Sequence, residues 1–149
     1  MKKVLAVMLG LVFVASIASA ADLKGKVGLG FNWPGIQLRY GITDSILAEA
    51  RVQMASNNVV VGGRGYYLLK EIPGNMAIIP YVGGEVDGIL NQYLTSGYMA
   101  GGFVGADLMV KKNISIGGDV GLSGVWLGST LGTYADWGLI FNVGVTYYF

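Results

Sequence analysis

Nine charged side chains lie inside otherwise apolar stretches, and their types could support chemistry. They are Lys26, Arg39, Glu49, Arg51, Arg64, Glu85, Asp87, Asp107 and Asp119. The carboxylate pairs Glu85 with Asp87 and Asp107 with Asp119 are of the kind that acid–base hydrolysis uses. The basic residues precede most of the acidic ones along the chain, and a buried charge without a partner is costly. We therefore expect these side chains to form ion pairs rather than a hydrolytic site.

Other kinds of chemistry find little support in the composition. The chain has no cysteine and no histidine, which excludes disulfides, thiolate metal sites and the usual Ser-His or Cys-His nucleophiles. The segment Gly62-Gly63-Arg64-Gly65 lacks the spacing and the lysine of a phosphate-binding loop. We expect no catalytic residue, no cofactor, no metal and no enzyme activity.

The charged residues share one phase of a two-residue alternation, and the other phase is apolar or aromatic. This period is typical of a strand with one apolar face. Pro80 interrupts one segment, and we expect a bulge there because proline cannot donate to the ladder. The alternation covers eight segments, at residues 24–33, 36–42, 46–54, 59–69, 76–87, 97–110, 114–127 and 137–149.

The separation of charge from the apolar phase favours a barrel in a membrane. Hydrophobic residues make up 53% of the chain and charged residues 13%, against about 25% charged in a typical soluble domain. The charged phase is also rich in glycine, as a narrow lumen requires. Aromatic residues gather near both ends of the segments, as at membrane interfaces. The sequence predicts an all-β fold, an eight-stranded antiparallel transmembrane β-barrel with its apolar face toward lipid.

The N-terminus has the pattern of a secretory signal peptide. Met1-Lys2-Lys3 is basic, residues 4–14 are almost all apolar, and Ala18-Ser19-Ala20 is a small-residue cleavage site. We expect a signal peptide at residues 1–20 and a single barrel domain at residues 21–149. The domain would hold eight basic and nine acidic side chains, which gives no basic surplus for binding nucleic acid.

Alternation alone leaves two other functions open. A secreted soluble barrel that binds an apolar ligand would show the same period with the two faces exchanged. A narrow pore for small solutes would have the same strands and an open lumen. The interior of eight strands is only wide enough for side chains. We therefore favour a structural, non-enzymatic barrel protein whose lumen is closed by salt bridges.

The C-terminus carries the one specific motif. Asn142, Gly144, Tyr147 and Phe149 resemble, in order, the terminal signal read by the outer-membrane barrel assembly machinery. With the expected signal peptide and strands, the chain resembles small bacterial outer-membrane β-barrel proteins of the OmpA-transmembrane/OmpX-like class. The resemblance implies a bacterial outer-membrane location, with lipid and the assembly machinery as partners, and we expect a monomer. The short turns at Pro34-Gly35 and Asn57-Asn58 depart from the long adhesive loops of that class.

Overall fold

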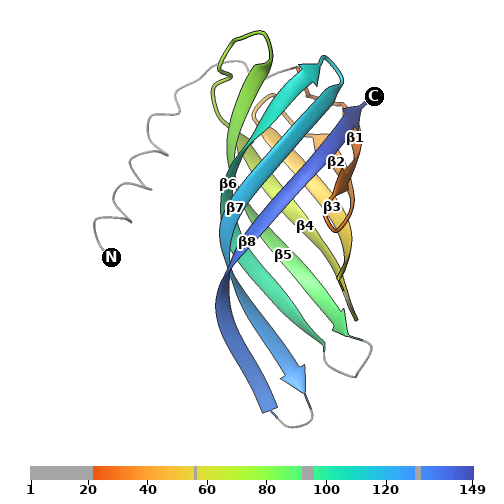
Figure 1. Ribbon diagram of the computed structural model, residues 1–149, viewed down its shortest axis with the longest axis vertical. Coiled ribbons are helices and arrows are strands. Elements are labelled where there is room, and N and C mark those ends of the chain that lie inside the picture. The colour runs from red at the N-terminus through yellow and green to blue at the C-terminus, as the bar shows by residue number, and fades with distance from the viewer. Residues whose placement is uncertain (1–21, 56, 92–95, 130–131) are drawn as a thin grey trace, which may run out of the picture.

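The computed structural model describes residues 22–55, 57–91, 96–129 and 132–149. In these residues the chain forms a closed barrel of eight strands, each antiparallel to the next, and the first strand pairs with the last (Figure 1). The predicted all-β, eight-stranded closed barrel is confirmed. The expected signal peptide lies outside the described residues. No helix in the described part of the chain is long and apolar enough to cross a membrane.

The strands differ greatly in length. The first two have 6 and 7 residues, whereas the last three have 16, 16 and 17. Their bounds are β1 Val27–Asn32, β2 Gly35–Gly41, β3 Ile46–Ala55, β4 Asn58–Leu68, β5 Ala77–Asn91, β6 Ser96–Lys111, β7 Ile114–Ser129 and β8 Gly132–Tyr148.

Several predicted boundaries were wrong. The first strand begins at Val27 rather than at residue 24, and two expected loops, at residues 88–96 and 128–136, are partly strand. The segment that opens β8 is polar and therefore resembles a loop. It is held as a strand by pairing with β7, for example Tyr134 opposite Leu127. Cross-strand pairing thus overrides local composition at this end of the barrel.

The expected bulge at Pro80 was also wrong. The β5–β6 register runs without a shift from Ala77 opposite Met109 to Leu90 opposite Ser96. In an antiparallel ladder a residue's N–H and C=O point toward the same neighbour. The Pro80 carbonyl accepts a hydrogen bond from Leu69, just beyond the end of β4. The missing N–H of Pro80 therefore faces the end of a ladder, so β6 loses no partner.

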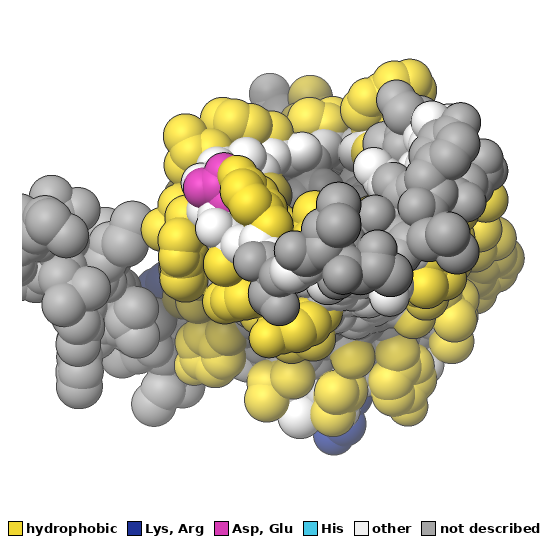
Figure 2. All heavy atoms as spheres, turned by 90° about the horizontal axis from the view of Figure 1, so that it is seen from below, with side chains coloured by type: hydrophobic (Ala, Val, Ile, Leu, Met, Phe, Trp, Pro, Cys, Tyr) yellow, Lys and Arg dark blue, Asp and Glu magenta, His cyan; other side chains and the backbone are white. Residues whose placement is uncertain are grey.

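The apolar side chains face outward and the charged ones inward. Val104 and Leu139 are exposed on the outer wall, whereas Arg39, Arg64 and Glu85 are buried in the lumen. Figure 2 looks along the barrel from its β7–β8 end and shows hydrophobic side chains around most of the outer rim. The outer face thus has the chemistry of a hydrophobic core, which is the reverse of a soluble barrel.

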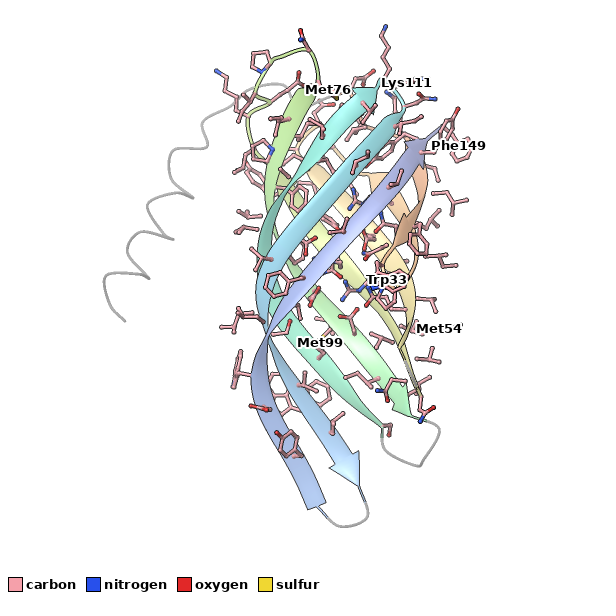
Figure 3. All side chains as sticks on the ribbon, viewed as in Figure 1. Trp33, Met54, Met76, Met99, Lys111 and Phe149 are labelled. Carbon is pink, nitrogen blue, oxygen red and sulfur yellow. The ribbon has the colours of Figure 1, made fainter. Side chains whose placement is uncertain are left out.

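Ring contacts between aromatic side chains on the outer wall occur in three places. Tyr98 stacks on Trp126, which packs edge-on against Trp137. At the other end, the rings of Tyr147 and Phe149 are in contact. Trp33 ends the first predicted segment, so we expected it at a rim of the barrel; it instead contacts Phe31 and lies near the middle of the molecule's length (Figure 3).

Apolar side chains fill the interior at the end of the barrel that holds the C-terminus. Leu47 begins β3, Leu68 ends β4 and Tyr148 ends β8, and all three are buried. The full cluster is Leu23, Leu47, Tyr66, Leu68, Ile79, Tyr81, Phe103 and Tyr148. Tyr66 and Phe103 lie among the charges, because both rings contact Arg64; the rest of the cluster fills the lumen toward the C-terminal end.

The opposite end of the barrel is uneven. The β7–β8 hairpin extends far past the β1–β2 turn (Figure 1). Near its tip, the Tyr134 hydroxyl donates a hydrogen bond of 2.8 Å to Asp136. This bond lowers the pKa of the Asp136 carboxyl group, which favours a charged and hydrated hairpin tip. Because of the unequal strand lengths, the barrel wall is tall on the β5–β8 side and low at β1–β2.

Candidate functional site

The candidate site is a layer of charged side chains across the middle of the lumen. Three neighbouring strands each supply one arginine: Arg39 on β2, Arg51 on β3 and Arg64 on β4. Their five carboxylate partners come from β3, β5, β6 and β7, and are Glu49, Glu85, Asp87, Asp107 and Asp119. Alternation places all eight on the inner face, and the stagger of the strands brings opposite charges within 3.1 Å of one another.

Arg39 joins its neighbouring strand to the far wall. Its Nε donates to Glu49 Oε2 at 2.8 Å, and its Nη1 donates to Asp107 Oδ2 at 2.8 Å. The Tyr66 hydroxyl donates to the same Glu49 oxygen at 2.6 Å. Because β2 and β6 are not neighbours in the sheet, the Arg39–Asp107 ion pair crosses the lumen.

Arg64 makes the second crossing. Its Nη1 and Nη2 donate to the two oxygens of Asp119 on β7 at 2.9 and 2.8 Å. This two-point geometry is the strong form of the arginine–carboxylate interaction. Its Nε lies 3.1 Å from Glu85 Oε2 without hydrogen-bond alignment. The guanidinium carbon also lies 3.6 Å from the centre of the Phe103 ring, a cation–π contact.

Arg51 binds two carboxylates of one strand. Its Nε and Nη2 donate to the two oxygens of Asp87 at 3.0 and 2.7 Å, and Nη2 also donates to Glu85 at 3.0 Å. The Ser123 hydroxyl donates to the other Glu85 oxygen at 2.9 Å. Residues 85 and 87 share a face because they are two apart on β5, so one arginine can serve both.

Every carboxylate of the network is bound by an arginine. All five carboxylates accept at least one hydrogen bond from an arginine. A hydrolytic pair needs a free acid and a free base on either side of a substrate. The predicted buried ion pairs are confirmed by this geometry, and they occupy the groups that such a pair would use.

The network carries an excess of negative charge. Three arginines face five carboxylates, a formal excess of two negative charges when all are ionised. Rings of acidic side chains select cations in channels. Any water-filled path opened through this layer would therefore favour cations.

Lys26 does not belong to the network, although the alternation placed it on the same face. It precedes β1, its side chain is partly exposed, and its ammonium lies 4.0 Å from Asp22. The sequence pattern did not reveal this difference, because it extended the first strand to residue 24; a residue beyond the end of the strand is not held to that strand's faces.

Neutral polar residues of the lumen were missing from the predicted network. The Asn142 amide donates to Asp119 Oδ1 at 2.9 Å, and Gln53 donates to Asn142 Oδ1 at 3.3 Å. Gln37 donates to Thr146 at 2.7 Å elsewhere in the lumen. All of these residues share the phase of the charges, so the period-two pattern would have found them.

The residues of the expected assembly signal divide between the two faces. Asn142 lies inside the lumen, and Gly144 lies opposite Asn32 and Gly117. Tyr147 and Phe149 lie on the outer wall, where the centres of their rings are 4.9 Å apart. Asn142 thus has a structural role in the lumen that the terminal motif does not require.

Comparisons of the chain with protein-family models, with curated proteins and with solved structures found no match. Its class is therefore defined by its own architecture: a closed, eight-stranded antiparallel barrel that buries an ion-pair network. This architecture is compatible with the OmpX-like fold expected from the sequence.

Glycine at position 62 makes room for the network, and we predict that Gly62→Ala destabilises the barrel. An alanine Cβ would coincide with the Asp87 carboxylate that binds Arg51. Overpacking of this kind costs about 1–3 kcal/mol, which denaturant unfolding of the refolded protein would measure. Gly65→Ala is the matched control, because on the same strand its Cβ meets nothing within 4 Å. Equal stability of the two variants would contradict the tight fit at Gly62.

Proposed function

We propose that this chain is a structural outer-membrane protein, a non-enzymatic barrel whose lumen is held shut by ion pairs. The observation that carries the proposal is the exposed apolar wall. Leu139 and Phe141 are 68% and 70% exposed, and neighbouring strands add further apolar side chains to the same face. Such a surface is unfavourable in water and favourable in lipid.

The soluble alternative is disfavoured by the direction of the two faces. A soluble barrel that binds an apolar ligand needs Val, Leu and Ile inside and charges outside. Here Arg39, Arg51 and Glu85 are inside, where they would repel an apolar ligand. The interior therefore supports closure over the binding of such a ligand.

The narrow-pore alternative is disfavoured by the contents of the lumen. Ion pairs cross it at mid-height, from Arg39 to Asp107 and from Arg64 to Asp119. The apolar cluster around Leu47 and Leu68 fills the C-terminal end of the lumen. An interior of eight strands leaves little room beyond its own side chains, so we expect no steady, porin-like conductance.

Cell fractionation with an unboiled gel-shift assay tests the proposal. The expected result is recovery in the outer-membrane fraction and faster migration on SDS gels before boiling than after it. Extraction by buffer without detergent would contradict the membrane location. Large, stable channels in planar bilayers would favour the pore.

We predict that deletion of Phe149 slows assembly. Phe149 is exposed at the end of the chain, packs against Tyr147 and donates its backbone N–H to Val27 at 2.9 Å. Its loss removes the final aromatic of the expected assembly signal, so unfolded chain should accumulate in the periplasm. Pulse-chase labelling with the gel-shift assay measures the rate. Phe149→Tyr is the control that keeps an aromatic ring, and unchanged insertion of the truncated chain would mean that the terminal motif is coincidental.

A further inference from the structure

The barrel wall is incomplete on the side of β1 and β2. A strand that crosses a membrane needs about 9–11 residues, and these two have 6 and 7. The β1–β8 ladder ends with Asn32 opposite Gly144, followed by the Trp33 N–H bond to the Val143 carbonyl. Farther out, β8 continues toward Gly132 without β1 beside it. In a membrane, this gap would face hydrocarbon rather than water.

A cavity of about 150 Å³ lies at this gap. Trp33 and Phe141 on its border are 69% and 70% exposed on the outer wall. Met99 and Ile140 line it from the inner faces of β6 and β8. The cavity therefore joins the outer apolar surface to the lumen sideways, on the β7–β8 hairpin side of the ion-pair network.

The floor of the cavity is polar and of mixed charge. It is formed by Arg51, Gln53, Glu85 and Asn142. The Arg51 side chain is 1% exposed, and among the described residues its Nη1 has no hydrogen-bond partner. A buried donor without a partner is costly, so a small shift of Arg51 that let Nη1 reach an acceptor oxygen in the cavity would be favourable.

The charges of the floor restrict the head group that could bind. An anion would approach Glu85 and the neighbouring Asp87, and a cation would approach Arg51. A neutral head with hydroxyl and carbonyl oxygens meets neither repulsion, and it can exchange hydrogen bonds with the amides of Gln53 and Asn142, which are less deeply buried than Glu85. The volume corresponds to about five water-sized groups, at about 30 Å³ each, which suits a glycerol-sized head.

We propose that this gap is a lateral binding site for a neutral, single-chain amphiphile, such as a monoacylglycerol, that enters from the membrane. Its oxygen-rich head lies on the polar floor beside Gln53 and Asn142. Its alkyl chain leaves between Trp33 and Phe141 and lies along Leu139 on the outer wall. The site rests on the proposed membrane location, because only there does the gap open onto lipid.

Fluorescence quenching of Trp33 tests the site. The parent protein carries Trp126→Phe and Trp137→Phe, so Trp33 is its sole tryptophan, and it is reconstituted in phosphatidylcholine vesicles. The probe is a monoacylglycerol with a brominated chain, and phosphatidylcholine brominated on its chain serves as the reference lipid. We expect the probe to quench more strongly than the reference at equal mole fraction, and to saturate. Equal, non-saturating quenching by both lipids would overturn the site.

Two variants on one face of β6 sharpen the test. Met99→Phe fills the cavity and should raise the probe mole fraction at half-maximal quenching by about tenfold. Met109→Phe, near the other end of β6, should leave this mole fraction unchanged. Ile140→Phe serves in place of Met99→Phe if that variant does not fold. Unchanged quenching in a folded cavity-filling variant would overturn the site.

Two further arms separate the route and the membrane location. Monobutyrin has the same head but stays in water. It should not compete with the probe, and competition would overturn entry from the membrane. The unboiled gel shift is run on the same vesicles: a protein that fails to insert contradicts the proposed function, whereas an inserted protein without excess quenching contradicts this site alone.

Discussion

Replacing Arg64 with alanine should destabilise the barrel by about 3–5 kcal/mol, because it removes one side of a buried ion pair. Asp119 would keep hydrogen bonds from Asn142 and Tyr81 but no arginine. Phe103 would also lose the guanidinium stacked on its ring. Denaturant unfolding in lipid vesicles measures the loss of stability. In planar bilayers, brief cation-selective openings should become more frequent than in the unmutated protein.

The controls for Arg64→Ala separate network effects from loss of charge alone. Lys26→Ala removes a cation whose partner Asp22 is exposed, and weak surface pairs of this kind contribute about 0–1 kcal/mol. Asp119→Leu should be destabilising on its own, and combining it with Arg64→Ala should cost less than the sum. Additive losses would contradict direct coupling of Arg64 and Asp119. If neither the unmutated protein nor Arg64→Ala produced openings in planar bilayers, Arg64 would not be the residue that closes the lumen.

Val104→Arg should destabilise the inserted protein by about 2–4 kcal/mol, the cost of arginine on the lipid face near the bilayer centre. Val104 is exposed and stands in the middle of β6, opposite Val82 and Val120. On a water-exposed wall the same substitution would stay within about 0.5 kcal/mol. Denaturant unfolding from lipid vesicles therefore reports the surroundings of the outer face.

Ala135→Arg is the matched control for Val104→Arg. Ala135 is exposed on the β7–β8 hairpin, opposite Trp126 and two residues beyond Trp137 toward the tip. If the hairpin projects from the bilayer, arginine there should cost little. A neutral Val104→Arg would remove the main support for the membrane location, whereas equal losses at both positions would place the hairpin in lipid as well.

Strand number and facing were predictable from the sequence because both follow from a local period. Each inward arginine is separated by an even number of residues from the other inward residues of its strand, so its facing can be read without knowing which strands are neighbours. The partner of each arginine was not predictable. The pairing of Arg64 with Asp119 depends on the stagger of β4 against β7, which arises from all the ladders between them.

The uneven wall was missed for a different reason. Lys24 and Lys26 continue the alternation of β1, so the pattern suggested a longer strand than the six residues that pair. Polar residues near Tyr134 suggested a loop where β8 pairs with β7. Strand ends are decided by partners across the sheet, and composition reports them poorly. The lateral cavity, which depends on these ends, was therefore also beyond the sequence.

The cross-lumen ion pairs also constrain how the chain can fold. Arg39 and Asp107 are 68 positions apart, and Arg64 and Asp119 are 55 apart. Such contacts are of high contact order, and their loop-closure entropy must be overcome before they stabilise anything. A nascent chain holding only its first four strands would carry the three arginines without most of their counter-ions. Charge compensation is thus complete only after β7 has been added, which disfavours strand-by-strand insertion and favours a transition state in which the whole sheet enters the bilayer together.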